Sequence, residues 1–129
     1  MSQSAFDEST LGTLDERAEI EMQTPRRDGS MTSRPIWVVV VDGSAYVRSV
    51  LGERGAWYRR AARDGRATIS TDRLTLPVTL EPVTDPELNR RISDAYRAKY
   101  EAGSPEPTAA MVSDEAVGTS LRLGAAPEQ

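Results

Sequence analysis

The segment RPIWVVVVDGSAYVRSVL, from Arg34 to Leu51, decides the fold class of this chain. Its first half is apolar and β-branched without alternation, which is typical of a central strand buried on both faces. Pro35 suits the start of such a strand, where no ladder donor is needed. Asp42-Gly43 is a strong hairpin signal, so the second half is expected to return antiparallel to the first. The segment therefore predicts an antiparallel sheet rather than a parallel one.

Further strands are expected on both sides of this hairpin. Upstream, EIEMQTPRR alternates apolar and polar residues with the period of a half-buried strand, and RDGS at its end is typical of a turn. Downstream, RATISTD predicts a short strand and RLTLPVTLEPV a longer one, in which Pro77 suggests an edge or a bulge. A last strand is expected over GTSLRLG, which brings the total to about six.

Three helices are expected besides these strands. Ser9 or Thr10 can cap a short helix near the start of the chain. AWYRRAARDG predicts a second short helix, which Gly65 ends. TDPELNRRISDAYRAKYEAG predicts one long helix, capped by Thr84 or Asp85, whose apolar residues form a single stripe. The SPEPT segment that follows is expected to be a loop.

Hairpins dominate this order of elements and βαβ units are nearly absent. The pattern indicates a mainly β protein with helices (α+β), built on an antiparallel sheet or barrel of about six strands with one long and two short helices. A length of 129 residues favours a single domain. We expect that domain to span residues 19–124, after a polar segment with a short helix over residues 1–18 and before a tail over residues 125–129.

Two absences narrow the possible chemistry. The chain has no cysteine, which excludes disulfides, a thiolate nucleophile and a Cys-ligated metal. It has no histidine, which excludes a Ser-His-Asp triad and the usual general base. The acidic residues are scattered and form no D-x-D-x-D cluster, so no metal site is predicted. If the protein is an enzyme, a bound organic cofactor is expected to carry the chemistry.

Charge and hydropathy bear on partners and location. The formal net charge of −4 disfavours nucleic acid as a partner. Lys99 is the only lysine, and it is expected, with Arg90, Arg91 and Arg97, on a solvated face of the long helix. No apolar run approaches the roughly 20 residues of a membrane helix. The first ten residues lack the features of a secretory signal, so the cytoplasm is the expected location.

At this point the sequence resembles a known family. The segments EIEMQTPRRDGSMTSRPIWVVVVDGSAYVRS, GAWYRRA, ISDAYRAKY and TSLRL cover nearly the whole chain and resemble a small bacterial domain-of-unknown-function family, number 2255. The pattern is also similar to the wider split β-barrel superfamily, which includes pyridoxamine phosphate oxidase-like flavoproteins and deazaflavin-dependent nitroreductases. The resemblance implies a split β-barrel, a homodimer, and FMN or a deazaflavin of the F420 type as cofactor.

The match to the superfamily is partial at its motifs. In the relatives, R-x-[ST]-G-R-x-x-x-x-P opens a hairpin, and this chain has RRDGSMTSRPIW there. A basic-plus-Ser pair then leads through a loop to W-Y-x-N-L, and here these are Arg48-Ser49, GERG and the WYRR that starts at Trp57. The Asn common in the nitroreductases is missing. The basic residues that hold phosphate in the oxidases are only partly matched.

The first candidate site joins Arg48 and Ser49 to Gly55, at the start of the second short helix. A helix N-terminus offers unpaired N–H groups and about half a positive charge, which suits an anion. Arg48 can add a bidentate contact. In the split-barrel relatives the flavin phosphate lies here. The alternative is that Arg48 pairs with a surface acid such as Glu53 and the glycines simply turn the chain.

Two further pairs of residues complete the candidates. Trp57 and Tyr58 can line a flat cofactor pocket, or Trp57 can instead anchor the core or a dimer interface. Ser33 and Arg34 lie where relatives contact the cofactor, and the alternative is an exposed turn with an edge arginine. Two functions stay open. One is a flavin- or deazaflavin-dependent oxidoreductase with an unknown small-molecule substrate, and the other is a dimeric scaffold that has lost the cofactor.

Overall fold

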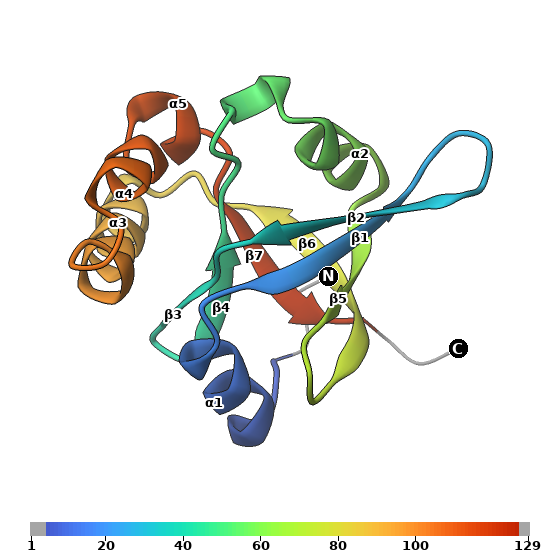
Figure 1. The fold of residues 1–129 in the computed structure, drawn as a ribbon, viewed down its shortest axis with the longest axis horizontal. Helices are drawn as coiled ribbons and strands as arrows, with labels where there is room; N and C mark the ends of the chain where they lie inside the picture. The colour runs from blue at the N-terminus through green and yellow to red at the C-terminus, as the bar shows by residue number, and fades with distance from the viewer. Residues whose placement is uncertain (1–4, 127–129) are drawn as a thin grey trace.

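A seven-stranded antiparallel sheet forms the centre of the computed structural model, which describes residues 5–126 (Figure 1). The strands, in chain order, are β1 (Ile20–Pro25), β2 (Met31–Ile36), β3 (Val39–Val41), β4 (Ser44–Val47), β5 (Arg66–Ser70), β6 (Thr75–Pro82) and β7 (Leu121–Ala125). They lie in the order β2-β1-β5-β6-β7-β4-β3, and every neighbouring pair is antiparallel. The sheet curls into a half-barrel, which confirms the predicted α+β class. The predicted polar start at residues 1–4 and the end of the tail at residues 127–129 lie outside the described residues.

Five α-helices and one 3-10 helix accompany the sheet within residues 5–126, where we expected three helices. They are α1 (Glu8–Glu16), the 3-10 helix η1 (Gly52–Arg54), α2 (Ala56–Asp64), α3 (Pro86–Tyr100), α4 (Pro105–Met111) and α5 (Asp114–Val117). Gly65 ends α2 in the left-handed region, with a φ of 67°, as predicted. Asp85 caps α3, and its carboxylate accepts hydrogen bonds from the first backbone N–H groups of the helix, also as predicted.

Helix α1 differs from the expectation in its cap and in its packing. The cap is Asp7, whose carboxylate accepts a hydrogen bond from the Thr10 backbone N–H at 2.7 Å, and neither Ser9 nor Thr10 takes that role. Aspartate is as good a cap as serine, and Asp7 lies directly before the first residue of the helix. Leu14 on the inner face of α1 is fully buried in the main core. The helix therefore packs as part of the same core as the sheet.

The apolar run IWVVVV is not one strand, which is why the sheet has seven strands instead of six. β2 pairs with β1 and ends at Ile36, and β3 pairs with β4 and begins at Val39. Between them, the Val38 backbone N–H and carbonyl bond to side chains of Lys99 and Tyr100, at the end of α3. The backbone groups are therefore satisfied outside the ladder, and the chain is free to turn from one pairing to the other.

The predicted SPEPT loop is helix α4. Prolines at positions 105 and 107 fall in its first turn, where a missing backbone N–H removes no helical hydrogen bond. The prolines of SPEPT, which predicted a loop, are therefore also compatible with the start of a helix. Met111, at the last position of α4, is buried against α3 and thus anchors the helix to the core.

Pro77 lies in an interior strand, β6, although we expected an edge or a bulge. It stands opposite Thr68 of β5, whereas the register with β7 begins only at Val78. The proline therefore falls where β6 is paired with a strand on one side only, so its missing N–H breaks no ladder on the other side.

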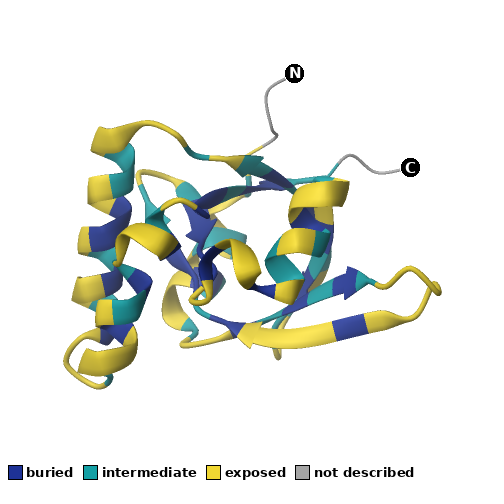
Figure 2. Ribbon diagram, turned by 90° about the horizontal axis from the view of Figure 1, so that it is seen from above, coloured by how far each residue is buried: buried dark blue, intermediate teal, exposed yellow. Residues whose placement is uncertain are grey.

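Two apolar clusters form the core, and Figure 2 shows the buried residues of the chain in dark blue. The larger one fills the inside of the curled sheet, and the smaller one joins α3 and α4 to β3 and β4. The hairpin between β1 and β2 extends away from the body and is mostly exposed. Among the helices described here, none is long and apolar enough to cross a membrane.

Candidate functional site

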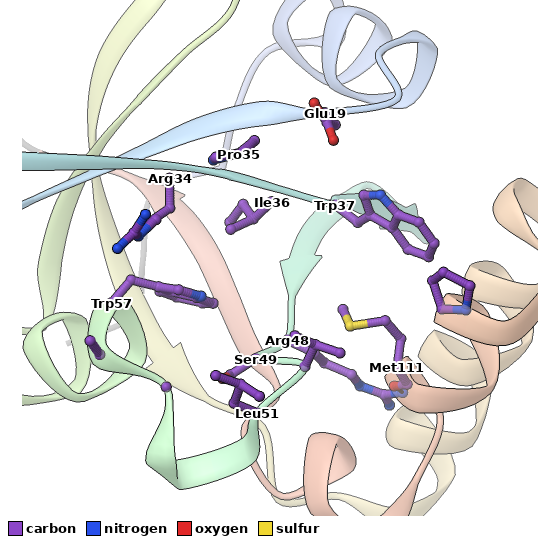
Figure 3. A pocket seen from close by; sticks show the side chains of 14 residues that line it. Glu19, Arg34, Pro35, Ile36, Trp37, Arg48, Ser49, Leu51, Trp57 and Met111 are labelled. Carbon is purple, nitrogen blue, oxygen red and sulfur yellow. Dashed lines mark hydrogen bonds between the residues drawn. The ribbon is translucent and has the colours of Figure 1, made fainter. Parts of the chain in front are cut away.

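A cavity of about 470 Å³ lies between the end of β2, the segment after β4, the start of α2, and α4 (Figure 3). Its walls are mainly apolar and aromatic: Ile36, Trp37, Leu51, Trp57 and Met111. A few polar residues, among them those at positions 19, 34 and 49, lie between them. A cavity of this size with few polar groups is typical of sites that bind small molecules or cofactors.

Both tryptophans of the chain line this cavity, and each is held by a tyrosine. Trp37 stacks on Tyr100, with 3.9 Å between ring centroids and 6° between planes. Trp57 packs edge-on against Tyr58 at 6.2 Å and also contacts the larger apolar cluster. Trp57 therefore faces both the cavity and the core, and its role toward a cofactor stays a prediction. Tyr58 is half-buried behind Trp57 and is not among the lining residues.

The guanidinium of Arg48 is buried, and its five N–H groups all bond to the protein. Nε donates to the Ser120 hydroxyl at 2.8 Å. Nη1 donates to the Ser93 hydroxyl at 2.8 Å and to the Met111 carbonyl at 3.1 Å. Nη2 donates to the Asn89 carbonyl at 2.8 Å and to its side-chain oxygen at 3.4 Å. One side chain thus ties the segment after β4 to α3, to the end of α4 and to the start of β7.

The hydrogen bonds of Arg48 support neither predicted role for this residue. Its donors are all used, so none is left for a phosphate, and its partners do not include Glu53. Arg48 lines the cavity while its guanidinium reaches away from it toward α4 (Figure 3). Burial lowers the pKa of this guanidinium, and the Tyr96 ring, 5.5 Å away, partly offsets that effect. Arginine stays charged in proteins, so the cation is compensated by neutral dipoles and an aromatic ring.

Ser49 and Gly55 form a small cradle at the start of α2. The Ser49 hydroxyl oxygen is buried and has no hydrogen-bond partner within residues 5–126. A Cβ added to Gly55 would fall on this oxygen, so the backbone and the hydroxyl lie in direct contact. No side chain caps the N-terminus of α2. The cradle therefore combines an unsatisfied hydroxyl with the positive end of a helix dipole.

The two predicted residues of β2 separate to opposite faces of the sheet. Arg34 lines the cavity and extends toward Trp57 (Figure 3). The Arg34 guanidinium has no hydrogen bond or ion pair within the described part of the chain, whereas the Arg34 backbone pairs with Met22 of β1. Ser33 points the other way, where its hydroxyl donates to the Glu21 carboxylate at 2.7 Å. Ser33 is therefore a surface contact between neighbouring strands and not a residue of the cavity.

Lys99 and Tyr100 lie behind the Trp37 wall, and burial shifts the pKa of both. Burial lowers the pKa of Lys99 to about 8, an effect that Asp15 partly opposes. Burial raises the pKa of the Tyr100 hydroxyl to about 12. Lys99 is thus not on the solvated face that we expected, because its ammonium turns inward to two backbone carbonyls.

These pKa values predict an unusual pH dependence of stability. From pH 8 to 10.5 the unfolded chain holds the Lys99 proton and the folded chain does not, so the free energy of unfolding should rise with pH. Above pH 10 it should fall, because burial raises the pKa of both Tyr96 and Tyr100, so these hydroxyls ionise in the unfolded chain at a lower pH than in the folded one. No histidine or cysteine titrates in this range. Urea unfolding at a series of pH values measures both the rise and the fall of the free energy of unfolding. The substitution Lys99→Met should remove the rise. If the free energy of unfolding of Lys99→Met still rose between pH 8 and 10.5, Lys99 would not be the cause of the rise.

Comparison with known proteins supplies the family. The sequence model of a family described as "Uncharacterized protein conserved in bacteria (DUF2255)" matches residues 10–123. The chain belongs to this family. A search of curated proteins finds no match.

Solved structures show which fold this family member has. A conserved hypothetical protein, Rv2991 from Mycobacterium tuberculosis, is 16% identical with a TM-score of 0.63, over 100% of this chain and 85% of that one. An F420-H2 dependent reductase, FDR-A, is 15% identical with a TM-score of 0.61, over 84% and 94%. The heme storage protein HutZ from Vibrio cholerae is 12% identical with a TM-score of 0.58, over 95% and 90%. At such identities the likeness establishes the split-barrel fold alone.

The cavity of this DUF2255 member also contains residues that sequence reasoning did not select. Trp37 was assigned to a central strand, Met111 to the region after a loop, and Glu19 to the start of a strand. Trp37 reaches the cavity because the chain turns at Val38, and Met111 reaches it because α4 packs against α3. The one local feature near Trp37 is Pro35, two residues before it. A proline beside an aromatic residue does not tell whether that residue lines a cavity or belongs to a core.

Proposed function

We propose that this protein binds FMN or a deazaflavin in the cavity, with the phosphate at the start of α2 and the ring against the tryptophans. One observation carries the proposal: the buried Ser49 hydroxyl has no partner within the described residues and lies against Gly55, at an uncapped helix N-terminus. A phosphate oxygen would accept hydrogen bonds from such a hydroxyl and from the first N–H groups of the helix. The family resemblance and the F420-dependent and heme-binding relatives agree with a cofactor in this fold.

Arg34 supplies the cation that Arg48 cannot. Its guanidinium extends into the cavity beside Trp57 and has no partner in the part of the chain that the structure describes. An arginine can bind a phosphate through two parallel hydrogen bonds. The phosphate role that the sequence suggested for Arg48 is therefore proposed for Arg34, which extends toward Trp57 in the first turn of α2.

The surface beyond Arg34 supports a ligand with more than one anionic group. Residues 26–34 and 59–66 hold seven arginines and two aspartates, a formal charge of +5, so the rest of the chain carries −9. The Arg60 guanidinium donates to the Thr24 hydroxyl at 3.1 Å, which ties α2 to β1, and Thr24 in turn pairs with Thr32 in the segment 26–34. Such a local field acts within a Debye length of about 8 Å despite the negative total.

The protein's own contribution would be to hold and shield the ligand. FMN or a deazaflavin, when bound, supplies hydride or electron transfer. The Trp37 and Trp57 rings would face a flat ring system, and the apolar Ile36 and Leu51 would keep water from it. Haem suits the site less, because the chain has neither histidine nor cysteine to ligate iron.

Tryptophan fluorescence tests the proposal directly, since both tryptophans line the cavity. Titration with FMN or a deazaflavin should quench their emission, and riboflavin, which lacks the phosphate, should bind more weakly than FMN. Equal affinity for FMN and riboflavin would remove the phosphate site from the proposal. Absence of quenching by all of these ligands would end the cofactor proposal as a whole.

Arg34→Ala is expected to weaken FMN binding by about 1.5–3 kcal/mol, the contribution of a charged hydrogen bond, and to leave riboflavin binding unchanged. The same titration measures both affinities. Arg90→Ala is the matched control, because Arg90 is exposed on α3 and pairs with Glu87. If Arg34→Ala changed FMN and riboflavin affinity equally, the arginine would contact the ring and not the phosphate.

We also propose that a second copy of the chain covers the open side of the cavity. Large apolar side chains that are more than half exposed, among residues 5–126, are those of Met31, Val50 and Leu51. Val50 and Leu51 are consecutive and line the cavity. Sedimentation velocity should show a dimer that Leu51→Lys converts to a monomer, because a charge would be buried without a partner. A monomeric parent protein would overturn this part of the proposal.

The alternative function is a dimeric scaffold without a cofactor. One observation favours it: the arginine of the Arg48-Ser49 pair is wholly engaged with the protein, so that part of the superfamily's anion site has become structural. The scaffold predicts a colourless protein whose thermal midpoint neither FMN nor a deazaflavin raises, whereas a bound cofactor stabilises the folded state.

A further inference from the structure

Trp37 belongs to the cavity wall, and neither it nor Val38 is part of a strand ladder. The ladder between β1 and β2 ends before it, and the ladder between β3 and β4 begins after it. The Val38 carbonyl accepts hydrogen bonds from Lys99 Nζ at 2.8 Å and from the Tyr100 hydroxyl at 3.1 Å. The Val38 N–H donates to the same hydroxyl at 3.3 Å. This wall is therefore attached to the last turn of α3.

Lys99 joins the wall to a second element, α1. Its ammonium also donates to the Leu14 carbonyl at 3.1 Å, in the last turn of α1, where carbonyls have no partner within the helix. The ammonium lies 5.3 Å from the centre of the Tyr100 ring, and that ring also stacks on Trp37 and contacts Tyr96. A cation over an aromatic face is attractive. Three independent contacts of one side chain thus meet behind the Trp37 ring.

The acidic groups near Lys99 do not substitute for its hydrogen bonds to the Leu14 and Val38 carbonyls, which together form a tether. Asp15 from α1 acts on Lys99 and on Tyr100, and Glu19 acts on Tyr100, but neither forms a hydrogen bond to Lys99 within the described residues. The tether consists of bonds from the ammonium to backbone carbonyls. Charge-assisted bonds of this kind are about twice as strong as neutral ones.

We propose that Lys99 is a positioning residue of the cavity, whose ammonium holds the Val38 backbone and thereby keeps the Trp37 ring in the wall. Removal of the ammonium leaves the segment attached by Tyr100 alone, whose single hydroxyl proton is shared between the Val38 and Ala18 carbonyls. The effect on cofactor affinity rests on the function proposed above. The effect on Trp37 does not, because it concerns the free protein.

The test isolates Trp37 by using Trp57→Phe as the parent, which leaves one tryptophan in the chain. Acrylamide quenching and the anisotropy of Trp37 are then measured at pH 7 without ligand, in Lys99→Met, Lys99→Arg and Lys99→Gln. The matched control is Arg97→Met, since Arg97 lies on the exposed face of the same helix and pairs with Asp94. Far-UV circular dichroism and the thermal midpoint report whether each variant is folded.

Lys99→Met is expected to increase the quenching of Trp37 by acrylamide and to lower its anisotropy. Lys99→Gln should do the same, because its shorter neutral amide cannot reach both the Leu14 and the Val38 carbonyl. Lys99→Arg should restore the parent values, because a guanidinium can donate to both. Arg97→Met should match the parent. A folded Lys99→Met or Lys99→Gln protein with parent-like Trp37 signals would overturn the proposal, and so would a Lys99→Arg protein as loose as Lys99→Met.

FMN titration of the same variants in the Trp57→Phe background gives the functional consequence. Lys99→Met should raise the dissociation constant roughly tenfold, as expected for the loss of one charged hydrogen bond in the wall, and Lys99→Arg should not. If the unsubstituted protein, with both tryptophans, does not bind FMN, the function proposed above fails while the Trp37 result still stands. If FMN binds equally to parent and Lys99→Met, the positioning role fails while the cofactor site remains.

Discussion

The variant Arg48→Ala is expected to lose roughly 3–5 kcal/mol of its free energy of unfolding, the scale for removing one member of a buried charged network. Arg48 is 1% exposed, and its guanidinium bonds to Ser93, Ser120, Asn89 and Met111. Alanine would leave these acceptors buried without a donor and open a cavity between α3, α4 and β7. Urea unfolding followed by far-UV circular dichroism measures the change.

The Arg48 result separates a structural role from a ligand contact. Arg90→Ala is the control, with an expected change within about 0.5 kcal/mol, because its ion pair with Glu87 is exposed. Arg48→Lys should fall between the two, since lysine keeps the charge but has three donors instead of five. If Arg48→Ala were as stable as the parent and lost only FMN binding, the arginine would be a phosphate ligand after all.

The second large effect is expected for Gly55→Ala, which should cost about 1–3 kcal/mol of stability, the range for overpacking. The added methyl group would clash with the Ser49 hydroxyl oxygen. It would also fill the cradle at the start of α2, so FMN affinity should fall to that of riboflavin. Thermal or urea unfolding and the fluorescence titration measure the two effects.

A second substitution distinguishes crowding from other causes. In Ser49→Ala/Gly55→Ala the clash with the hydroxyl is gone, so stability should recover in part while phosphate binding should not. Gly12→Ala is the control with the opposite sign: Gly12 lies within α1 with open space around it, so alanine should stabilise by about 0.5–1 kcal/mol. If Gly55→Ala kept the stability and the FMN affinity of the parent protein, Ser49 and Gly55 would not form a phosphate cradle.

The candidate site was predictable where a single segment forms it. Ser49, Gly55 and Trp57 lie within nine residues of one another in a strand–loop–helix segment, and all three line the cavity. Arg34 lines it as well, and its neighbour Ser33 does not, because adjacent residues of a strand point to opposite faces. Without the strand boundaries, the sequence could not determine which of these two faces inward.

Local signals in the sequence determined most of the fold. Asp42-Gly43 specified the hairpin between β3 and β4, because such a pair readily adopts the positive φ angles of its turn. Asp85 and Gly65 specified the start of α3 and the end of α2, because caps act on backbone groups within a few residues. These features require no knowledge of any other part of the chain.

Only the tertiary structure decided the role of Arg48 and the end of β2. The bonds of Arg48 reach across 41 to 72 positions of the chain, and those of Val38 reach 61 and 62 positions to α3. A hydrogen bond between such distant groups leaves no periodicity or cap in either segment. From the sequence, an arginine beside a helix N-terminus resembles an anion ligand, but in the fold the donors of Arg48 bond to buried acceptors of the protein. An unbroken apolar run resembles one strand, but in the fold the Val38 backbone bonds to side chains of α3 and leaves the ladder.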